Sequence, residues 1–186
     1  LQESNSSNPS LSVIIVDDCS PDPLLVKTNL PFLNIKLHRN EKRAGLALSR
    51  NIATKLCQTE WILFCDDDDI PSQRLLINFL SLIYHLREHH LDSVLFYGTT
   101  VFRKSIRADK ILDLKSLFLL GFTPPVSSQF YRTKTLLRSV VMFHGRSGID
   151  HSLWISLLSL NPLILVTPRE GSFMNTIIDS SRMTYN

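Results

Sequence analysis

The stretch that decides the fold is residues 61–71, WILFCDDDDIP, in which an apolar run leads directly into four carboxylates and a proline. Runs of this length that are rich in aromatic and apolar residues are typical of buried strands. In α/β proteins, ligands bind at loops that follow the carboxyl ends of parallel strands. The stretch therefore predicts an α/β protein with an acidic loop at the end of a central strand.

The four consecutive aspartates, Asp66 to Asp69, repel one another. Two charges about 4 Å apart cost on the order of 4 kcal/mol at an effective dielectric constant of about 20. A divalent cation would remove that cost, and hard cations such as Mg²⁺ take carboxylate oxygens as ligands. A hydrated acidic turn is the alternative interpretation, and the stretch alone leaves both open.

Composition indicates one globular domain in 186 residues, of which 44% are hydrophobic and 20% charged. The net charge of +3 is too small to indicate attraction to nucleic acid or to a membrane. Cys19, Cys57 and Cys65 are an odd number without zinc-like spacing, which favours free thiols in a reducing compartment. No signal peptide and no apolar run of about 20 residues is visible. We therefore expect a cytoplasmic protein.

Hydrophobic periodicity predicts strands and helices in alternation. We expect strands at 12–16, 35–38, 93–97, 126–131 and 161–166, and helices at 24–33, 47–57, 71–90, 111–120 and 134–142. The strand at 93–97 is expected to continue as a hairpin arm through Val101 and Phe102. The helix at 47–57 has Leu48, Ile52 and Leu56 at four-residue spacing, so these should share its apolar face.

The longest predicted helix, 71–90, has an apolar face and a polar end. Its expected core residues are Leu75, Leu76, Phe79, Leu80, Ile83 and Leu86. His85, His89 and His90 lie near its end. Their spacing is compatible with metal binding, but a hydrated helix end is the simpler interpretation.

Three further polar positions have both a structural and a chemical interpretation. Asp17 and Asp18 follow the strand at 12–16, where they either form a turn or bind a ligand. Arg50 lies either on a helix surface or beside a phosphate, which a guanidinium binds through two hydrogen bonds. Asp150, within GRSGIDHSLW at 145–154, either caps a helix or serves as a catalytic carboxylate.

Three stretches together resemble the family 2 glycosyltransferases of the GT-A fold. They are VDDCSPD at 16–22, the segment from Arg39 through SRN at 49–51 to the aspartates at 66–69, and GIDHSLW at 148–154. The resemblance covers roughly 11–166. It implies a three-layer α/β/α sandwich with a mostly parallel central sheet, as a single domain over 1–186. Residues 1–10 are expected to be flexible and 167–186 to form an irregular tail.

The resemblance also implies how a nucleotide-sugar donor is bound. Asp18 matches the aspartate that hydrogen-bonds the nucleotide base, with Asp17 beside it. Arg50 matches a basic residue near the nucleotide, and Asp67 a residue near the ribose. Asp66, together with Asp68, matches the element that holds Mg²⁺ or Mn²⁺ on the diphosphate.

For the acceptor, the resemblance makes Asp150 the general base and Trp154 an aromatic packed behind it. The implied reaction is inverting transfer from a UDP-sugar to a hydroxyl of a glycan or lipid-linked glycan, in surface polysaccharide or glycoconjugate synthesis. Such an acceptor implies peripheral association with the inner membrane face. Ile149 stands where the family usually has glutamate. The family's first βα unit has no counterpart before Asp17, so we expect an N-terminally truncated domain with weakened nucleotide binding.

Two other classes of protein share part of the pattern. A phosphatase of the haloacid dehalogenase type also needs Asp-x-Asp after an apolar strand, but in the first strand, and with Thr or Val where Ile70 stands. A phospho-receiver domain would use Asp17, Asp18 and Asp66, but needs neither Arg50 nor the stretch around Asp150. Both are weaker matches than the glycosyltransferase.

Overall fold

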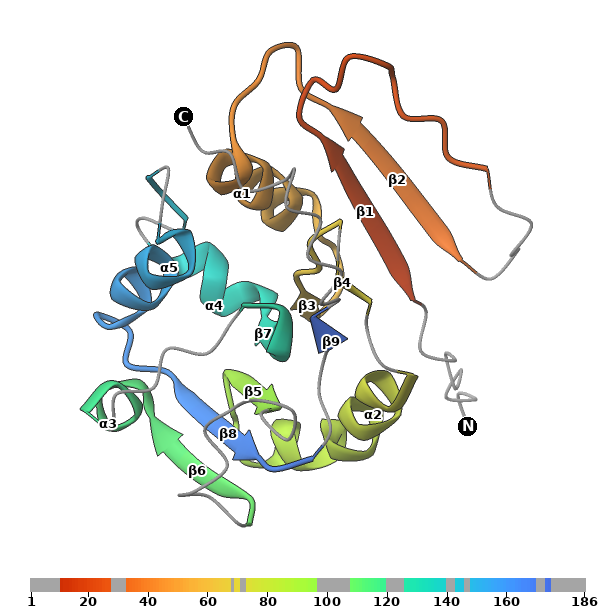
Figure 1. Cartoon of the computed structure of the whole chain (residues 1–186). Helices are drawn as coiled ribbons and strands as arrows, with labels where there is room; N and C mark the ends of the chain where they lie inside the picture. The colour runs from red at the N-terminus through yellow and green to blue at the C-terminus, as the bar shows by residue number, and fades with distance from the viewer. Residues whose placement is uncertain are drawn as a thin grey trace, which may run out of the picture. The chain divides into compact units, whose positions relative to one another are not determined.

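The computed structural model describes residues 11–27, 33–67, 69–70, 73–96, 108–119, 126–139, 143–145, 148–169 and 173–174. The chain divides into two compact units, and Figure 1 labels the helices and strands that they contain. Unit 1 comprises Leu1–Ile62 and Arg132–Leu160, and unit 2 comprises Leu63–Tyr131 and Asn161–Asn186. The expectation of a single domain over 1–186 stays a prediction.

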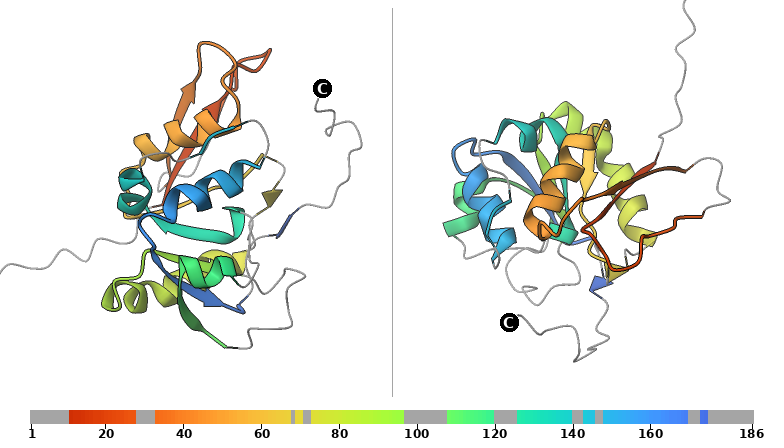
Figure 2. Two further views of the ribbon diagram at one scale, coloured as in Figure 1. Left: turned by 90° about the vertical axis from the view of Figure 1, so that its left-hand side faces the viewer. Right: turned by 90° about the horizontal axis from the view of Figure 1, so that it is seen from above.

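Unit 1 is built on two parallel strands, β1 (Ser12–Asp17) and β2 (Asn34–Arg39), which pair in register from Ser12 with Asn34 to Asp17 with Arg39. Helix α1 (Leu46–Leu56) packs against β1 (Figure 2). Two helices from later in the chain, α4 (Thr133–Arg138) and α5 (Ile149–Leu157), belong to the same unit. The strand predicted at 12–16 is present as β1. Among the described strands it bonds only to β2, so residues 12–16 are half-buried.

Helix α1 forms where the sequence predicts it, but it buries a different face. Leu48, expected on the apolar face, is 47% exposed. The buried residues are Ala47, Ser49, Arg50 and Thr54, and the Thr54 hydroxyl donates to the Arg50 carbonyl at 2.9 Å. The prediction failed because a polar face can be buried when its groups find hydrogen-bond partners.

Unit 2 contains a mixed sheet with the strand order β7-β5-β8-β6. The strands are β5 (Ser93–Phe96), β6 (Lys110–Asp113), β7 (Gln129–Arg132) and β8 (Leu163–Thr167), with the 3-10 turn η1 (Val126–Ser128) before β7. β5 and β8 are parallel, whereas β7 and β6 run antiparallel to their neighbours. The α/β class is therefore as predicted, with more antiparallel pairing than expected.

Helix α2 (Gln73–Glu88) packs on β5 through a core of aromatic rings. Phe79 stacks on Phe130 with ring centroids 3.9 Å apart, and Phe96 meets Phe130 edge-on at 6.1 Å. Of the expected core residues of this helix, Leu76 and Leu80 are 38% and 37% exposed instead. Leu82, which the apolar spacing left out, is buried.

The segment predicted as a helix at 111–120 divides into β6 and the short helix α3 (Leu114–Leu119). Asp113 marks the boundary, because its carboxylate accepts hydrogen bonds from the Ser116 N–H at 2.9 Å and from the Ser116 hydroxyl at 2.8 Å. This is a helix-capping arrangement. The predicted helix at 24–33 is wrong for residues 24–27, which have no regular structure.

Short strands complete the structure: β3 (Trp61–Leu63), and β4 (Asp69–Ile70) paired antiparallel with β9 (Phe173–Met174). The expected hairpin arm at Val101 and Phe102 lies outside the described residues, as do residues 1–10. No helix in the described part of the chain is both long enough and apolar enough to cross a membrane.

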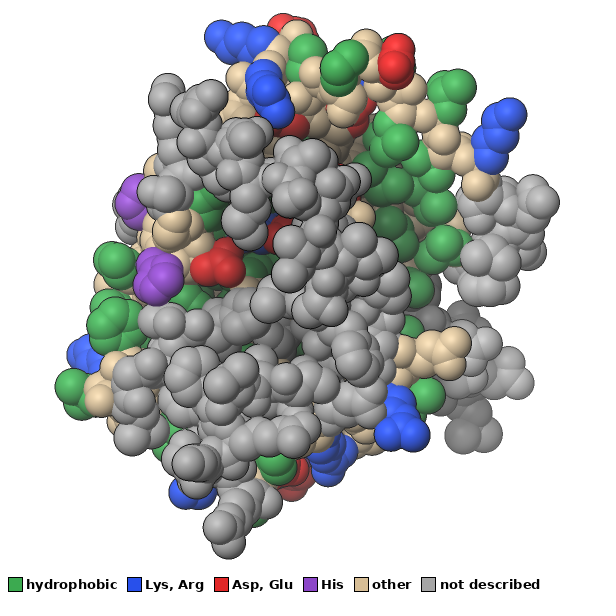
Figure 3. Space-filling view, viewed as in Figure 1, with side chains coloured by type: hydrophobic (Ala, Val, Ile, Leu, Met, Phe, Trp, Pro, Cys, Tyr) green, Lys and Arg blue, Asp and Glu red, His purple; other side chains and the backbone are tan. Residues whose placement is uncertain are grey.

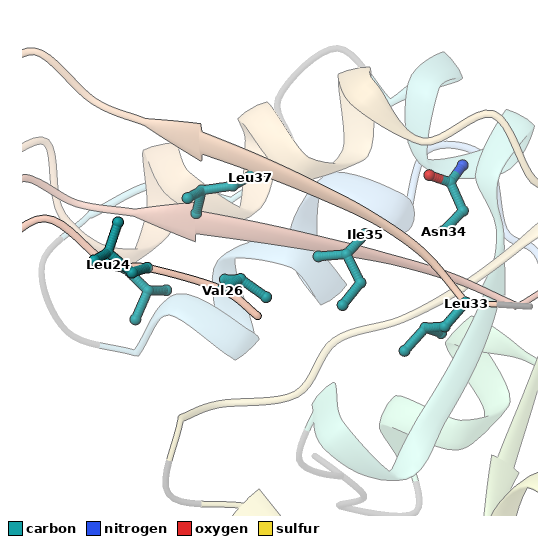
Figure 4. A pocket seen from close by; sticks show the side chains of 7 residues that line it. Leu24, Val26, Leu33, Asn34, Ile35 and Leu37 are labelled. Atoms are coloured by element: carbon teal, nitrogen blue, oxygen red, sulfur yellow. The ribbon is translucent and has the colours of Figure 1, made fainter. Parts of the chain in front are cut away.

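Hydrophobic side chains gather over β1 and β2 in unit 1 (Figure 3). They line an apolar pocket of about 540 Å³ between the loop after β1 and strand β2. Leu24 and Val26 of the loop lie beside Ile35 and Leu37 of β2 (Figure 4). The pocket contains no carboxylate, so the candidate chemistry lies elsewhere in this unit.

Candidate active site

Asp17, the last residue of β1, fixes the turn that follows the strand. The side chain is almost fully buried, at 2% exposure. Its carboxylate accepts the Ser20 N–H at 2.9 Å and the Leu24 N–H at 3.5 Å, and pairs with the Arg39 guanidinium from the end of β2. These bonds, those from Ser20 foremost, lower the pKa of Asp17 to about 2. Asp17 is therefore a structural anion of the β1–β2 pair.

Asp18 organises the loop that leads into α1. One carboxylate oxygen accepts hydrogen bonds from the Asn40 amide at 2.7 Å and from the Ala44 N–H at 2.8 Å, and the other accepts the Gly45 N–H at 2.8 Å. Desolvation raises the pKa of Asp18, but these hydrogen bonds together outweigh it and hold the pKa below its usual range. Gly45 has a φ of 86° and occupies the N-cap of α1, so glycine suits this close turn.

Arg50 and Asp150, which are 100 residues apart in the chain, form an ion pair inside unit 1. The Arg50 Nη1 atom lies 2.7 Å from the Asp150 Oδ1 atom. The guanidinium side chain is 7% exposed, whereas the carboxylate side chain is 36% exposed. The buried cation therefore orients a carboxylate that solvent, or a substrate, can still reach.

A short segment ties the two helices of this pair together. The Asn51 side chain accepts the Phe143 N–H at 3.0 Å and donates to the Phe143 carbonyl at 2.9 Å. The Arg50 guanidinium carbon lies 5.3 Å from the centre of the Phe143 ring. The His144 N–H donates to the Ser152 hydroxyl at 2.9 Å. Segment 143–144 thus joins α1 to α5.

Asp150 is the second residue of α5, not its cap. The N-cap is Gly148, with a φ of 63° and no side-chain cap bond. The capping interpretation of Asp150 is therefore wrong, because its carboxylate turns to Arg50 instead. Trp154, one helical turn further along, is 1% exposed and packs in the core of unit 1. Its expected place behind the general base stays a prediction.

The acidic stretch belongs to unit 2. Asp66 is half-buried and Asp67 exposed, in a turn closed by the Asp69 N–H, which donates to the Asp66 carbonyl at 3.1 Å. Asp68 lies outside the described residues. The donors present are carboxylate oxygens, which are the ligand type that suits Mg²⁺ and Mn²⁺. Of the predicted site residues, Asp17, Asp18, Arg50 and Asp150 belong to unit 1, and the structure pairs Arg50 with Asp150.

The sequence indicates Arg50 and Asp150 as candidate residues, but it does not indicate that they are partners. It predicts no role for Asn51 or Ser152. No local sequence pattern predicts the contact between Asn51 and Phe143, because the two residues are 92 positions apart in the chain. The GT-A element order could have indicated that α1 and α5 meet. Neither the register of the contact nor its hydrogen bonds could be read from it.

A parallel strand pair that ends in two structured aspartates, with a carboxylate from a later helix held beside a buried arginine, is the arrangement expected of a nucleotide-sugar transferase. Residues 2–147, most of the chain, match glycosyl transferase family 2, and the chain belongs to that family. The matched range includes Asp17, Asp18, Arg50 and the acidic stretch, and ends just before Asp150.

Two relatives illustrate the match. The chain is 28% identical over 185 residues to the poly(ribitol-phosphate) beta-N-acetylglucosaminyltransferase TarS of Staphylococcus aureus, covering 88% of this chain and 31% of that protein. It is 42% identical over 69 residues to an uncharacterized glycosyltransferase of Haemophilus influenzae, covering 37% of this chain and 22% of that one. The chain therefore spans less than a third of the length of either relative.

The solved structures show the fold. The crystal structure of S. aureus TarS 1-349 superposes with a TM-score of 0.67 at 23% identity, covering 89% of this chain and 52% of that one. The complex of the same fragment with UDP-GlcNAc gives the same TM-score and covers 50% of that chain. The GT-A fold predicted from the sequence is confirmed.

Proposed function

We propose that this chain transfers a sugar from a UDP-sugar to an acceptor hydroxyl with inversion at the anomeric carbon. The family match and the UDP-GlcNAc complex of the structural neighbour support the donor class. The observation that carries the proposal is the Asp150 carboxylate, oriented by buried Arg50 and still 36% exposed. A general base has to be both fixed in direction and accessible to the proton that it removes.

In the proposed reaction Asp150 takes the proton of the acceptor hydroxyl. The acceptor oxygen forms a bond to the anomeric carbon while the bond from that carbon to the diphosphate oxygen breaks. The bonding electrons leave with the nucleoside diphosphate, and the proton stays on Asp150. Arg50 is a positioning residue, because it holds the direction of the carboxylate. A single displacement inverts the anomeric configuration.

The loops around Asp17 and Asp18 are the proposed site for the nucleotide base. Asp18 is the proposed hydrogen-bond partner of the base, and the hydrogen bonds that it accepts from Asn40, Ala44 and Gly45 also fix this loop. Asp17 does the same for the turn that begins at Ser20. Arg50 stays a candidate neighbour of the donor as well as of Asp150.

Asp66 and Asp68 are the proposed ligands of a Mg²⁺ or Mn²⁺ ion, with Asp67 near the ribose. When bound, the ion would neutralise the negative charge of the leaving diphosphate. The oxygen donors of Asp66 and its neighbours fit such a hard cation.

The proposed acceptor is a hydroxyl of a surface polysaccharide or glycoconjugate. The support is the name of the relative TarS, which specifies poly(ribitol-phosphate) as its acceptor. Synthesis from a UDP-sugar would place the chain in the cytoplasm, with peripheral contact to the inner membrane face if the acceptor is lipid-linked. The phosphatase and phospho-receiver interpretations have no support from the family match.

The test is the variant Asp150→Asn, assayed by UDP release from UDP-GlcNAc with and without a poly(ribitol-phosphate) acceptor. We expect the transfer rate to fall by about 10²–10⁴-fold, the usual contribution of a general base. UDP binding, measured by calorimetry, should stay within about twofold, since asparagine keeps the shape of the side chain and the base acts on the acceptor.

The matched control is Asp109→Asn, which removes one negative charge from an exposed residue of unit 2 that has no role in the proposed reaction. It should leave the transfer rate unchanged. Fluorescence of Trp61 and Trp154, both buried in unit 1, shows whether each variant is folded. An Asp150→Asn protein that is folded and transfers sugar at the wild-type rate would refute the assignment of the base.

A further inference from the structure

The end of α2 and the turn that follows it, in unit 2, carry a group of metal-ligating side chains unrelated to the acidic stretch. His85, Glu88 and His89 each offer one ligand atom, and these atoms all lie within 4.8 Å of one another. Positions i, i+3 and i+4 share one face of a helix. The imidazole rings of His85 and His89 lie with centroids 4.3 Å apart.

The backbone under this group is fixed. The His89 N–H donates to the His85 carbonyl at 3.1 Å, so the two histidines are joined by a regular helical hydrogen bond. Beyond it, the Leu91 N–H donates to the Leu86 carbonyl at 2.9 Å, and the His90 N–H to the Arg87 carbonyl at 3.2 Å. With His90 at a φ of 52°, these bonds form a Schellman motif.

The same motif anchors the helix end in the core. Leu86 and Leu91, which come into contact in such a motif, are both 0% exposed. Glu88 and His89 lie on the exposed side of this anchored turn, and His85 is half-buried. The histidines are therefore held at their spacing before any ion arrives, and binding needs only side-chain rotation.

A cationic side chain near His85, that of Arg169, has an acidic partner of its own. His85 also lines a cavity of about 510 Å³ together with Asp109 and Arg169. Arg169 is paired with Asp109 at 3.6 Å and donates to the Ser81 hydroxyl at 2.9 Å, one turn before His85. At the helix end itself, the partial negative charge of the last carbonyls favours a cation.

We propose that His85, Glu88 and His89 form a binding site for a divalent transition-metal ion of the Zn²⁺ type. Neutral imidazole is a ligand for Zn²⁺, Ni²⁺ and Cu²⁺, whereas Mg²⁺ and Mn²⁺ prefer carboxylate and water oxygens. Two ligand atoms each about 2.1 Å from zinc lie no more than about 4.2 Å apart, so small rotations of the side chains, mainly those of exposed Glu88 and His89, close the site. Water would occupy the fourth position of this open surface site.

The test is a calorimetric titration of the metal-free protein with Zn²⁺ in the presence of excess Mg²⁺, which occupies sites made of carboxylate oxygens. We expect one equivalent of Zn²⁺ to bind. His85→Ala and His89→Ala should each weaken binding by at least about tenfold, because even partners one shell further from a metal contribute about 10–100-fold. Glu88→Gln should weaken binding less than either histidine variant.

The matched control is His90→Asn, which removes the neighbouring histidine outside the group and keeps a residue that accepts a positive φ. It should bind Zn²⁺ within about twofold of the wild type, while circular dichroism confirms that all variants keep their helix content. No Zn²⁺ uptake at about 1 mM, or wild-type affinity in His89→Ala, would overturn the proposal. The result does not depend on whether the protein transfers a sugar.

Discussion

The Arg50–Asp150 pair should respond asymmetrically to removal of its two members. Both variants lose the same 2.7 Å contact, but each leaves a different charge behind. Asp150→Ala leaves a guanidinium whose side chain is 7% exposed, and Arg50→Met leaves a carboxylate whose side chain is 36% exposed. Water can solvate the second charge far better than the first, so we expect Asp150→Ala to destabilise unit 1 more.

The magnitudes follow from the burial of each group. Removing one partner of a buried ion pair costs about 3–5 kcal/mol, and the partial exposure of Asp150 places Asp150→Ala near about 3.5 kcal/mol. For Arg50→Met, the rehydrated carboxylate reduces the loss to about 1.5 kcal/mol, the lower end for a charged hydrogen bond. Loss of the guanidinium over Phe143 adds about 0.5 kcal/mol, while methionine keeps the apolar stem.

The assay is urea unfolding at pH 7 followed by tryptophan fluorescence, because Trp61 and Trp154 both report on unit 1. A difference of about 1.5 kcal/mol corresponds to midpoints separated by about 0.5–1.5 M urea. The double variant Arg50→Met/Asp150→Ala should be more stable than the sum of the single losses predicts, with a coupling of about 1–3 kcal/mol. Equal midpoints for the two single variants would refute the reasoning from burial.

Three other variants test the framework around the site. Asn51→Ala removes both hydrogen bonds to the Phe143 backbone and should lower the free energy of unfolding by about 2 kcal/mol in the same urea assay. The hydrogen bonds to Asp17, foremost those from Ser20, lower its pKa to about 2 in the folded protein. The ionised carboxylate therefore stabilises the fold above about pH 4, and this stabilisation is lost as the pH falls towards 2. In Asp17→Asn the urea midpoint should vary less with pH across that window. His90→Gly should raise the free energy of unfolding by about 1 kcal/mol, measured by thermal unfolding, because glycine accepts the φ of 52° without strain.

The elements that the sequence predicts well are those whose apolar residues face a core. Helix α2 and strands β5 and β8 lie where the hydrophobic pattern places them, within a few residues. The helix predicted at 111–120 failed because periodicity alone cannot separate a short strand from the helix that follows it. Asp113 was the available signal, since an aspartate three residues before a serine can cap a helix.

The site was predictable by residue type but not by contact. Asp18 and Asp150 stand out because carboxylates at the end of a strand and the start of a helix are typical of ligand-binding edges. Their partners are set by the three-dimensional packing, and the partner of Asp150 comes from 100 residues earlier. The same holds for Asn51, whose two bonds to Phe143 have no counterpart in local sequence. Whether Asp66 and Asp68 bind a metal ion stays a prediction.

Helix α1 buries a polar face instead of the predicted apolar one, and this links the stability of unit 1 to the proposed chemistry. An apolar helix face would pack without fixing direction, since hydrophobic contacts are not directional. Here α1 buries Ser49 and Arg50 and leaves Leu48 47% exposed, so it meets its neighbours through directional hydrogen bonds. One bond of this buried face, from Arg50 to Asp150, thus serves both the packing of the helix and the direction of the carboxylate. Arg50→Met should therefore lower the transfer rate as well as the stability of unit 1, because Asp150 would lose the guanidinium that it pairs with.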